Sequence, residues 1–361
     1  MYKWQYQYWL QSVTGIKNKT KQKLVEYCGG AEEVFFIKEK QLASIYGILP
    51  EEVQAIAESR KIWDFQKQTE IFLESGISMV TIEEEAFPER LRYLTDCPYA
   101  LFYKGNYPKN TERTVAIVGA RACSSYGRAM ALEIGEALSA CGVSVISGMA
   151  SGIDSFGHWG AIKGDGKTYA VLGCGADVCY PRGGRQLYER ILEKGGIISE
   201  YLPGTAPVKW QFPARNRLIS AFSDVVIVIE AKEKSGSLIT ADFALEQGKD
   251  IYAVPGRVDD VPSYGCNALI HQGAGIILSV KELISDLNLD MDKTSVEKEK
   301  RKKLLEKEEL MVYSCFGLHT KNLEDLVQMT GLSASELSDV IVRLQMKGFL
   351  EEPFKNHYRK K

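Results

Sequence analysis

The chain has 361 residues, enough for two or three domains, and its 45 basic and 47 acidic residues leave a formal net charge of −2. Any binding to nucleic acid must therefore rest on local clusters of basic side chains, because the chain as a whole does not attract a polyanion. No apolar run is long enough to span a bilayer and residues 1–13 lack the order of a signal peptide, so we expect a cytoplasmic protein with no membrane partner.

The first segment, 1–75, contains two similar turns that each precede a predicted helix. Val13-Thr14-Gly15-Ile16 leads into a helix that ends near Tyr27, and Ile45-Tyr46-Gly47-Ile48 leads into one that ends near Ser59. This pattern is typical of a helix-hairpin-helix unit, whose glycine lets backbone N–H groups approach a phosphate. A basic edge follows the first turn and consists of Lys17, Lys19, Lys21 and Lys23. The segment is either a helical packing domain or a DNA-contacting one.

Residues 76–287, with a connecting segment at their start, are predicted to form an α/β domain. Short aliphatic runs break into glycine and small polar residues; the clearest are Thr114–Val118, Val143–Ile146, Val225–Ile229 and Ile251–Val254. Helical patterns at Tyr126–Ala140 and Leu238–Gln247 alternate with these strands, which predicts βαβ units around an extended Rossmann-like parallel sheet. Because the carboxyl ends of parallel strands share one edge, the glycine turns should converge on a crevice suited to a phosphate.

The last part of the chain is predicted to be a charged linker, 288–302, followed by a small domain, 303–361. Ser333-Ala334-Ser335-Glu336 is a capping box that opens an amphipathic helix. A shorter helix precedes it, and two short strands that can form a wing follow it. This order is typical of a winged helix-turn-helix domain. The outward basic side chains of its second helix are only Arg343 and Lys347, so the sequence leaves both DNA contact and protein contact open.

The crevice of the sheet domain carries few groups for catalysis. Its first turn has Arg121 where a dinucleotide site needs a second glycine, so nicotinamide binding is disfavoured. The sequence has no P-loop, no carboxylate pair for magnesium and no Cys-x-x-Cys pair among its eight cysteines, which argues against a metal or a disulfide framework. An enzyme that acts on nucleotides, with Glu230 as acid or base, is the alternative. Asp154 and His158 lie one helical turn apart, and we expect a hydrogen bond between them.

Hydrogen-bond donors and positive charge are plentiful in the same crevice. Basic side chains surround the glycine turns, at Arg121, Arg182, Arg185, Lys209, Arg215 and Arg217. The aromatic side chains of Tyr180, Trp210 and Phe212 offer stacking surfaces for exposed bases, so the pattern indicates a single-stranded nucleic acid. We expect one or two of the arginines to pair with Glu200 or Glu230, but not Arg121.

The motifs of the sheet domain resemble the DNA-processing protein DprA family, also called Smf. They occur in the order of that family and include Val118-Gly119-Ala120-Arg121, Ser147–Asp154 with His158, Tyr180-Pro181, Phe212-Pro213-Ala214-Arg215-Asn216-Arg217, Ser235–Thr240 and Val254-Pro255-Gly256. The resemblance is continuous over about Tyr99–Leu278. The flanks are similar to that family's sterile-alpha-motif-like and winged-helix domains. One position departs from the family pattern: relatives usually have Tyr-Pro-x-x-Asn, and Gly184 occupies the position of that asparagine here.

This resemblance implies a non-enzymatic mediator of recombination and natural transformation that binds single-stranded DNA, dimerises, loads the RecA recombinase and needs no cofactor. The residues and the resemblance together predict a DNA-binding set that consists of Arg121, Gly148, Ser151, Gly152, Arg182, Lys209, Phe212, Arg215, Asn216, Arg217, Ser235, Gly236 and Ser237. The resemblance also places a dimer interface at Asn267 and Ile276. Phosphoribohydrolases share a similar fold, but their Pro-Gly-Gly-x-Gly-Thr motif is missing from this chain. Nucleotide hydrolysis is therefore the alternative and not the main prediction.

Overall fold

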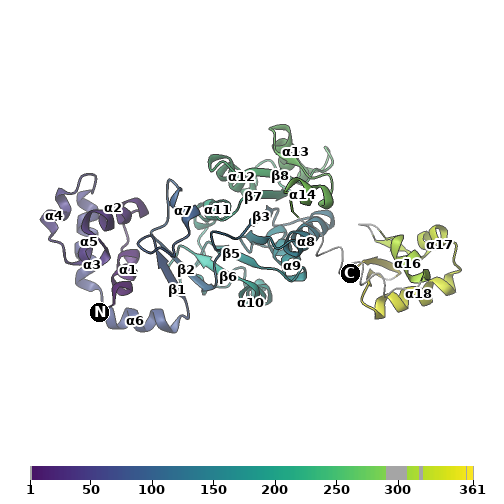
Figure 1. Ribbon diagram of the computed structural model, residues 1–361, viewed down its shortest axis with the longest axis horizontal. Coiled ribbons are helices and arrows are strands. Elements are labelled where there is room, and N and C mark those ends of the chain that lie inside the picture. The colour runs from purple at the N-terminus through teal and green to yellow at the C-terminus, as the bar shows by residue number, and fades with distance from the viewer. Residues whose placement is uncertain (1, 290–306, 317–319, 355, 361) are drawn as a thin grey trace. The chain divides into compact units, whose positions relative to one another are not determined.

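The structure is a computed structural model that describes residues 2–289, 307–316, 320–354 and 356–360. It divides into two compact units, Met1–Leu289 and Asp290–Lys361, each with its own hydrophobic core (Figure 1). The predicted linker, 288–302, lies outside the described residues from residue 290 onward. No helix in the described parts of the chain combines the length and apolar character needed to cross a membrane.

Short helices form the N-terminal part of the first unit. They are α1 (Lys3–Ser12), α2 (Asn18–Cys28), α3 (Ala31–Phe36), α4 (Glu39–Ser44), α5 (Pro50–Ile62) and α6 (Phe65–Glu74). The two predicted turns precede α2 and α5, and their glycines, Gly15 and Gly47, have φ angles of 84° and 78° that favour glycine. Trp9, Leu24 and Ile56 are fully buried in the core of this helical part. The helix-hairpin-helix interpretation stays a prediction.

The prediction that Lys21 belongs to an exposed basic edge is wrong. The Lys21 Nζ donates to the backbone oxygen of Gln11 at 2.7 Å and to Oε1 of the same residue at 3.0 Å. Lys21 is 5% exposed, so this amine lies inside the protein and not on a DNA-facing surface, and its burial lowers its pKa to about 7. Lys23 is half-buried, with its Nζ 5.2 Å from the ring centroid of Tyr46.

A nine-stranded sheet forms the centre of the first unit, in the order β1-β2-β6-β5-β4-β3-β7-β8-β9. The strands are β1 (Ser78–Thr81), β2 (Ala100–Gly105), β3 (Thr114–Gly119), β4 (Ser144–Ser147), β5 (Thr168–Leu172), β6 (Gly196–Ser199), β7 (Val225–Ile229), β8 (Asp250–Ala253) and β9 (Gly275–Ile276). Strands β3 to β9 pair in parallel, whereas β2 is antiparallel to both β1 and β6. The predicted Rossmann-like parallel sheet is confirmed.

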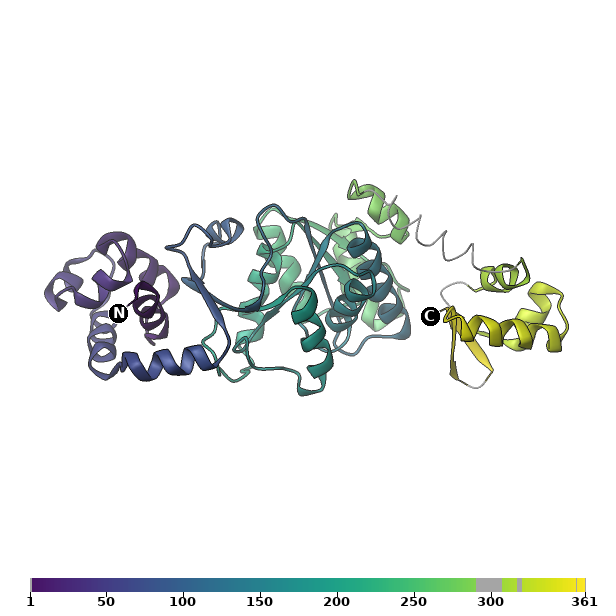
Figure 2. The same ribbon diagram turned by 60° about the horizontal axis from the view of Figure 1, so that its bottom comes forward.

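Helices cover both faces of this sheet (Figures 1 and 2). They are α7 (Glu89–Arg92), α8 (Ser125–Ala140), α9 (Ile153–Lys163), α10 (Arg185–Lys194), α11 (Gln211–Ala221), α12 (Gly236–Glu246), α13 (Tyr264–His271) and α14 (Val280–Asp286). Helices α8, α9 and α10 lie side by side, whereas α11, α12 and α13 contribute to the core on the opposite face. Strands β3 to β7 are almost wholly buried, as double coverage requires.

The helical part and the sheet belong to one compact unit because α1 packs on the antiparallel end of the sheet. Gln7 donates to Thr81 Oγ1 at 3.0 Å, Gln11 donates to the backbone oxygen of Glu200 at 3.1 Å, and the rings of Tyr8 and Phe102 meet edge to face. The predicted boundary between segments 1–75 and 76–287 stays a prediction.

The second unit contains helices and a small sheet. Its elements are α16 (Lys307–Ser314), β10 (Lys321–Asn322), α17 (Leu323–Thr330), α18 (Ala334–Met346), β11 (Leu350–Phe354) and β12 (His357–Lys360). The predicted capping box is confirmed, because the Ser333 side chain accepts from the Glu336 N–H and the Glu336 carboxylate accepts from the Ser333 N–H. The hairpin of β11 and β12 lies where two short strands were expected, and assignment as a winged helix stays a prediction.

The two outward basic side chains predicted here, Arg343 of α18 and Lys347 directly after it, form ion pairs with α16. Lys347 Nζ lies 2.7 Å from Glu309, whose side chain is fully buried, and Arg343 lies 3.6 Å from Glu308. These pairs reduce the positive charge that α18 could offer to a phosphate backbone.

Candidate nucleic-acid interface

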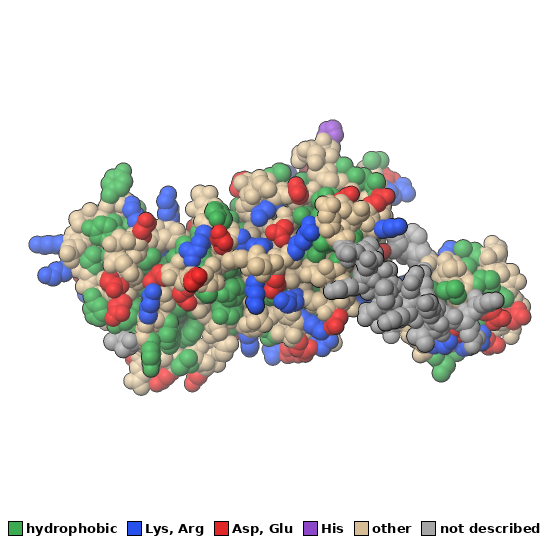
Figure 3. All heavy atoms as spheres, viewed as in Figure 1, with side chains coloured by type: hydrophobic (Ala, Val, Ile, Leu, Met, Phe, Trp, Pro, Cys, Tyr) green, Lys and Arg blue, Asp and Glu red, His purple; other side chains and the backbone are tan. Residues whose placement is uncertain are grey.

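The glycine turns of the parallel strands lie together at the carboxyl edge of the sheet, as predicted. Helix α8 begins after Ser124, α9 begins after Gly152 and α12 begins after Ser235, so three helix N-termini reach this edge from different turns. Helix N-termini present unpaired N–H groups and a partial positive charge, which favour anions. The surface seen in Figure 3 has acidic and basic side chains interspersed, so attraction for a polyanion depends on local groups at this edge.

An arginine and two aromatic rings stack at the edge. The guanidinium carbon of Arg121 lies 5.7 Å from the ring centroid of Phe212, and the rings of Phe212 and Tyr180 stack with centroids 5.3 Å apart and planes 30° apart. The three residues come from three separate segments: the β3–α8 turn, the first turn of α11 and the β5–α10 loop. Arg121 and Tyr180 are exposed, so the stack is open to a ligand. We call these three residues the stacking cluster.

Further exposed basic and aromatic residues were predicted for the interface. Arg182 and Lys209 are exposed, and neither forms an ion pair within the described part of the chain. Trp210 is 63% exposed and its ring meets that of Tyr201 edge to face. Arg185, which follows the departure at Gly184, pairs with Glu189 at 2.7 Å on α10.

The turn between β4 and α9 is occupied by a carboxylate of the protein itself. Asp154 Oδ2 accepts from the N–H of Gly148 at 3.2 Å and from the N–H of Ala150 at 3.4 Å. Two of the donors expected to meet a phosphate are therefore already paired, while Ser151 stays exposed. Asp154 is buried, and burial raises the pKa of its carboxyl while the nearby Arg215 charge opposes that rise. The sequence signal was an aspartate in the first turn of a helix, a position that commonly bonds back to preceding N–H groups.

The glycines of this turn make room for neighbouring groups of the protein. A Cβ on Gly148 would lie 2.4 Å from the guanidinium of Arg215, and a Cβ on Gly152 would lie 2.2 Å from the backbone oxygen of Ala120. Gly152 also has a φ of 82°. These two glycines therefore pack adjacent segments together, whereas Gly236 is exposed and a Cβ there would meet nothing within 4 Å.

Arg215 and Arg217, both predicted to bind DNA, point into the protein. They are 4% and 8% exposed. Arg215 donates to the backbone oxygens of Gly148 and Val171, and Arg217 lies 2.6 Å from Glu200 and 3.3 Å from Asp96. The expected pairing of an arginine with Glu200 is thereby confirmed. A phosphate contact by either arginine stays a prediction that its burial does not support.

The remaining predicted polar residues connect α11 with α12. Asn216 donates to the backbone oxygen of Gly236 at 3.2 Å, and its Oδ1 lies 3.3 Å from Nε of Arg215. Ser235 caps α12 by accepting from the Ser237 N–H, and the two hydroxyls lie 2.8 Å apart. Ser235 and Gly236 reach the surface, whereas Ser237 is buried.

The predicted hydrogen bond between Asp154 and His158 is wrong. His158 Nδ1 lies 2.6 Å from Thr168 Oγ1, and its Nε2 is buried without a partner. Burial lowers the pKa of His158 to about 3, so the ring is neutral. The two side chains diverge because Asp154 turns back to the preceding loop while His158 faces the start of β5.

Glu230, the candidate acid or base of a nucleotide enzyme, is committed to a structural role. Its carboxylate accepts from the backbone N–H of Ser124 at 2.8 Å and from the Ser124 hydroxyl. Glu230 is buried and has a φ of 54°, an uncommon angle for this residue type. It therefore anchors the start of α8 beside the turn that carries Arg121.

The two residues predicted for a dimer interface differ in exposure. Asn267 is half-buried, and its amide exchanges hydrogen bonds with the backbone of Gly256. Ile276 is 41% exposed on β9, the outermost strand of the sheet. Its neighbour Ile277 is buried and Leu278 is 71% exposed, so the apolar run faces alternately inward and outward.

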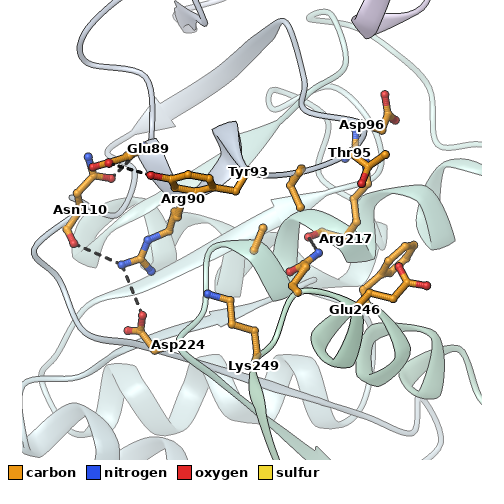
Figure 4. A pocket seen from close by; sticks show the side chains of 14 residues that line it. Glu89, Arg90, Tyr93, Thr95, Asp96, Asn110, Arg217, Asp224, Glu246 and Lys249 are labelled. Atoms are coloured by element: carbon orange, nitrogen blue, oxygen red, sulfur yellow. Dashed lines mark hydrogen bonds and ion pairs between the residues drawn. The ribbon is translucent and has the colours of Figure 1, made fainter.

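A cleft of about 630 Å³ lies at the opposite edge of the sheet, near the amino ends of β3, β7 and β8. Figure 4 shows Arg90, Asp224 and Lys249 on one side of it, with Arg217 and Glu246 on the other. Four carboxylates line the cleft, those of Glu89, Asp96, Asp224 and Glu246. Three basic side chains, Arg90, Arg217 and Lys249, line the same cleft, so its charge is mixed and it offers no excess of positive charge to a polyanion.

Comparison with known proteins places the sheet domain in a family. A family model described as DNA recombination-mediator protein A matches residues 78–288. The DNA processing protein DprA of Streptococcus pneumoniae is 41% identical over 206 residues, which cover 57% of this chain and 73% of that protein. DprA of Bacillus subtilis is 40% identical over 217 residues, which cover 60% of this chain and 73% of the relative.

Solved structures give the same assignment. The X-ray structure of DprA from Streptococcus pneumoniae superposes with a TM-score of 0.69 at 33% identity, covering 78% of this chain and 97% of that one. A structure reported for the single-stranded DNA binding mode of DNA processing protein A from Helicobacter pylori gives a TM-score of 0.53 at 30% identity, covering 58% and 95%. With this agreement of sequence, fold and glycine turns, the chain belongs to the DNA recombination-mediator protein A family, also named DprA or Smf.

Proposed function

We propose that this protein is a non-enzymatic, cytoplasmic single-stranded DNA-binding protein that loads RecA in homologous recombination and natural transformation. The observation that carries the DNA-binding part is the stacking cluster of Arg121, Phe212 and Tyr180 at the carboxyl edge of the sheet. Family membership supports the role in recombination, and the Helicobacter pylori relative supports a single strand as the ligand. RecA as a partner rests on the resemblance described above.

The chemistry of the edge suits an unpaired strand. Aromatic rings and guanidinium planes stack on any base, and arginines and helix N-termini bind phosphates without reading base edges. A duplex hides the base faces in its stack, so the aromatic rings would lose their part of the contact. Binding should therefore be stronger for a single strand and largely independent of sequence.

A titration of labelled oligonucleotides tests this proposal. We expect the full chain to bind a single strand more tightly than the duplex of the same length, with little difference between mixed sequences. Affinity should fall steeply as salt rises, because each phosphate contact releases counterions. Fluorescence anisotropy at several salt concentrations measures both effects. Equal affinity for the two forms at physiological salt would refute the proposal.

Nucleotide hydrolysis is the alternative function, with Glu230 as its acid or base. The commitment of Glu230 to Ser124 argues against this alternative, because a carboxylate that already accepts two hydrogen bonds at a helix start is poorly placed to exchange protons with a substrate. Incubation of the purified protein with nucleoside monophosphates, followed by chromatography for free base, decides between the two functions. Release of free base in proportion to the protein, and its loss in Glu230→Gln, would favour the hydrolase.

The second compact unit is proposed to modulate function without forming the main DNA site. A chain that ends at Leu289 retains the whole first unit, including the stacking cluster. We expect this truncated chain to fold and to keep most of its single-strand affinity, because Arg343 and Lys347 already pair with acids of their own unit. Circular dichroism checks the fold, and the anisotropy titration checks the affinity. Loss of binding by the folded truncated chain would move the principal site to the second unit.

A further inference from the structure

We propose that Asp154 and Arg215 are positioning residues that preset the Gly148–Gly152 turn, and through α11 the stacking cluster, for single-stranded DNA. The inference rests on the proposed function. It assigns to Arg215 a role inside the protein in place of the phosphate contact predicted from the sequence. Neither side chain needs to touch DNA.

Asp154 binds the Gly148–Gly152 turn through the backbone N–H groups of the turn. Its Oδ2 accepts from the N–H groups of Gly148, which is buried, and Ala150, which is half-buried, so the buried donor is not left unpaired. Between them, Met149 has a φ of 55°, a left-handed angle that costs free energy for a side chain of this kind. A carboxylate that binds on both sides of Met149 stabilises this strained conformation before any ligand arrives.

Arg215 fixes the same turn from the side of α11. Its guanidinium donates to the backbone oxygen of Gly148 at 2.9 Å and to that of Val171 in β5. It fills the space that a side chain on Gly148 would occupy. Asp154 and Arg215 thus bind the N–H and the C=O of one residue, Gly148, and the positive charge of Arg215 opposes the rise that burial causes in the pKa of Asp154.

Helix α11 connects buried Arg215 with Phe212 of the stacking cluster. Phe212 precedes Arg215 by three residues, so both side chains lie within one turn of the same helix. Phe212 contacts both other members of the stacking cluster, the guanidinium of Arg121 and the ring of Tyr180. A second connection is made by Gly152, whose backbone lies against Ala120 and Arg121. Arg215 therefore lies on the helix that carries Phe212, and Asp154 binds the turn whose last residue, Gly152, lies against Arg121.

Salt dependence separates a positioning residue from a contact residue. The full chain is titrated with a labelled oligothymidylate at several salt concentrations, as wild type, Asp154→Asn and Arg215→Lys. Each variant should weaken binding by ten-fold or more at fixed salt, with the wild-type slope of log affinity against log salt, because no phosphate contact is lost. Arg121→Ala is the reference for a contact and should reduce the slope by about 0.7. Arg215→Lys keeps the buried positive charge opposite Asp154, and it keeps the experiment decisive if Asp154→Asn does not fold.

Glu112→Gln is the matched control. Glu112 accepts hydrogen bonds from Ser144, Lys167 and Tyr169 near the amino ends of the strands, so this variant loses a comparable carboxylate far from the turn. It should lower the melting temperature and leave DNA affinity unchanged. Wild-type affinity for Asp154→Asn or Arg215→Lys, folded by circular dichroism, would overturn the inference. A slope reduced by about 0.7 in a further variant, Arg215→Gln, which removes the charge, would overturn it too, since Arg215 would then contact a phosphate. If the wild type itself does not bind the oligonucleotide, the proposed function fails and not this inference alone.

Discussion

Replacing Arg121 or Arg182 by alanine is expected to weaken single-strand binding by about 1–3 kcal/mol each, without loss of the fold. Each change removes a charge-assisted contact with phosphate. Arg121 also contributes a guanidinium plane over Phe212, so its loss exposes a ring face and removes a stacking surface. Both side chains are exposed, and no ion pair within the described residues depends on them, so the free energy of unfolding should change little.

The matched control for these two variants is Arg190→Ala. Arg190 is an exposed arginine of α10 that pairs with Glu193, and it is not among the residues predicted to bind DNA. Anisotropy titrations should show an unchanged dissociation constant for this control and an increase for the other two variants. The slope of log affinity against log salt should fall for Arg121→Ala and Arg182→Ala only. If Arg121→Ala unfolds the protein and causes no specific loss of binding, the arginine is a structural partner and the interface lies elsewhere.

The sheet could be predicted closely because its signals are local. The run Val225–Ile229 coincides with β7, and Tyr126–Ala140 differs from α8 by one residue at its start. Aliphatic runs between glycine turns fix both the strand type and the position of the crevice, since all parallel strands share one carboxyl edge. The sequence also places Tyr180 and Phe212 at that edge, whereas the stacking of the two rings on each other is known from the structure alone.

The orientation of the charged side chains could not be predicted in the same way. Arg215 and Arg217 stand in a run of polar residues, yet both guanidinium groups are buried because α11 packs on the sheet along that side. Their partners, the Gly148 carbonyl and Glu200, come from other parts of the chain. The spacing of residues along the sequence does not reveal which basic side chain binds which distant carboxylate or carbonyl. Lys21, which accompanies exposed lysines in the sequence but is buried against Gln11, shows the same difficulty.

Ile276→Arg is expected to convert a dimer into a folded monomer. Ile276 and Leu278 are exposed at the outer edge of the sheet, on and just after β9, whereas Ile277 between them is buried. An exposed apolar pair on an edge strand suits contact with a second copy of the chain, and an arginine there would have to be buried without a partner in the dimer, which costs several kcal/mol. The side chain projects outward in the isolated chain, so the fold should be retained.

Sedimentation of the wild type and of Ile276→Arg measures this effect directly, and Leu73→Arg is its control. Leu73 is 65% exposed on α6, so the control introduces the same charge at an apolar surface position of the helical part. The wild type and Leu73→Arg should sediment as dimers and Ile276→Arg as a monomer. The monomer should also bind a long single strand more weakly, because two linked sites on one strand bind with an avidity that a single site lacks. If the wild type sediments as a dimer and Ile276→Arg also does, this edge is not the dimer interface.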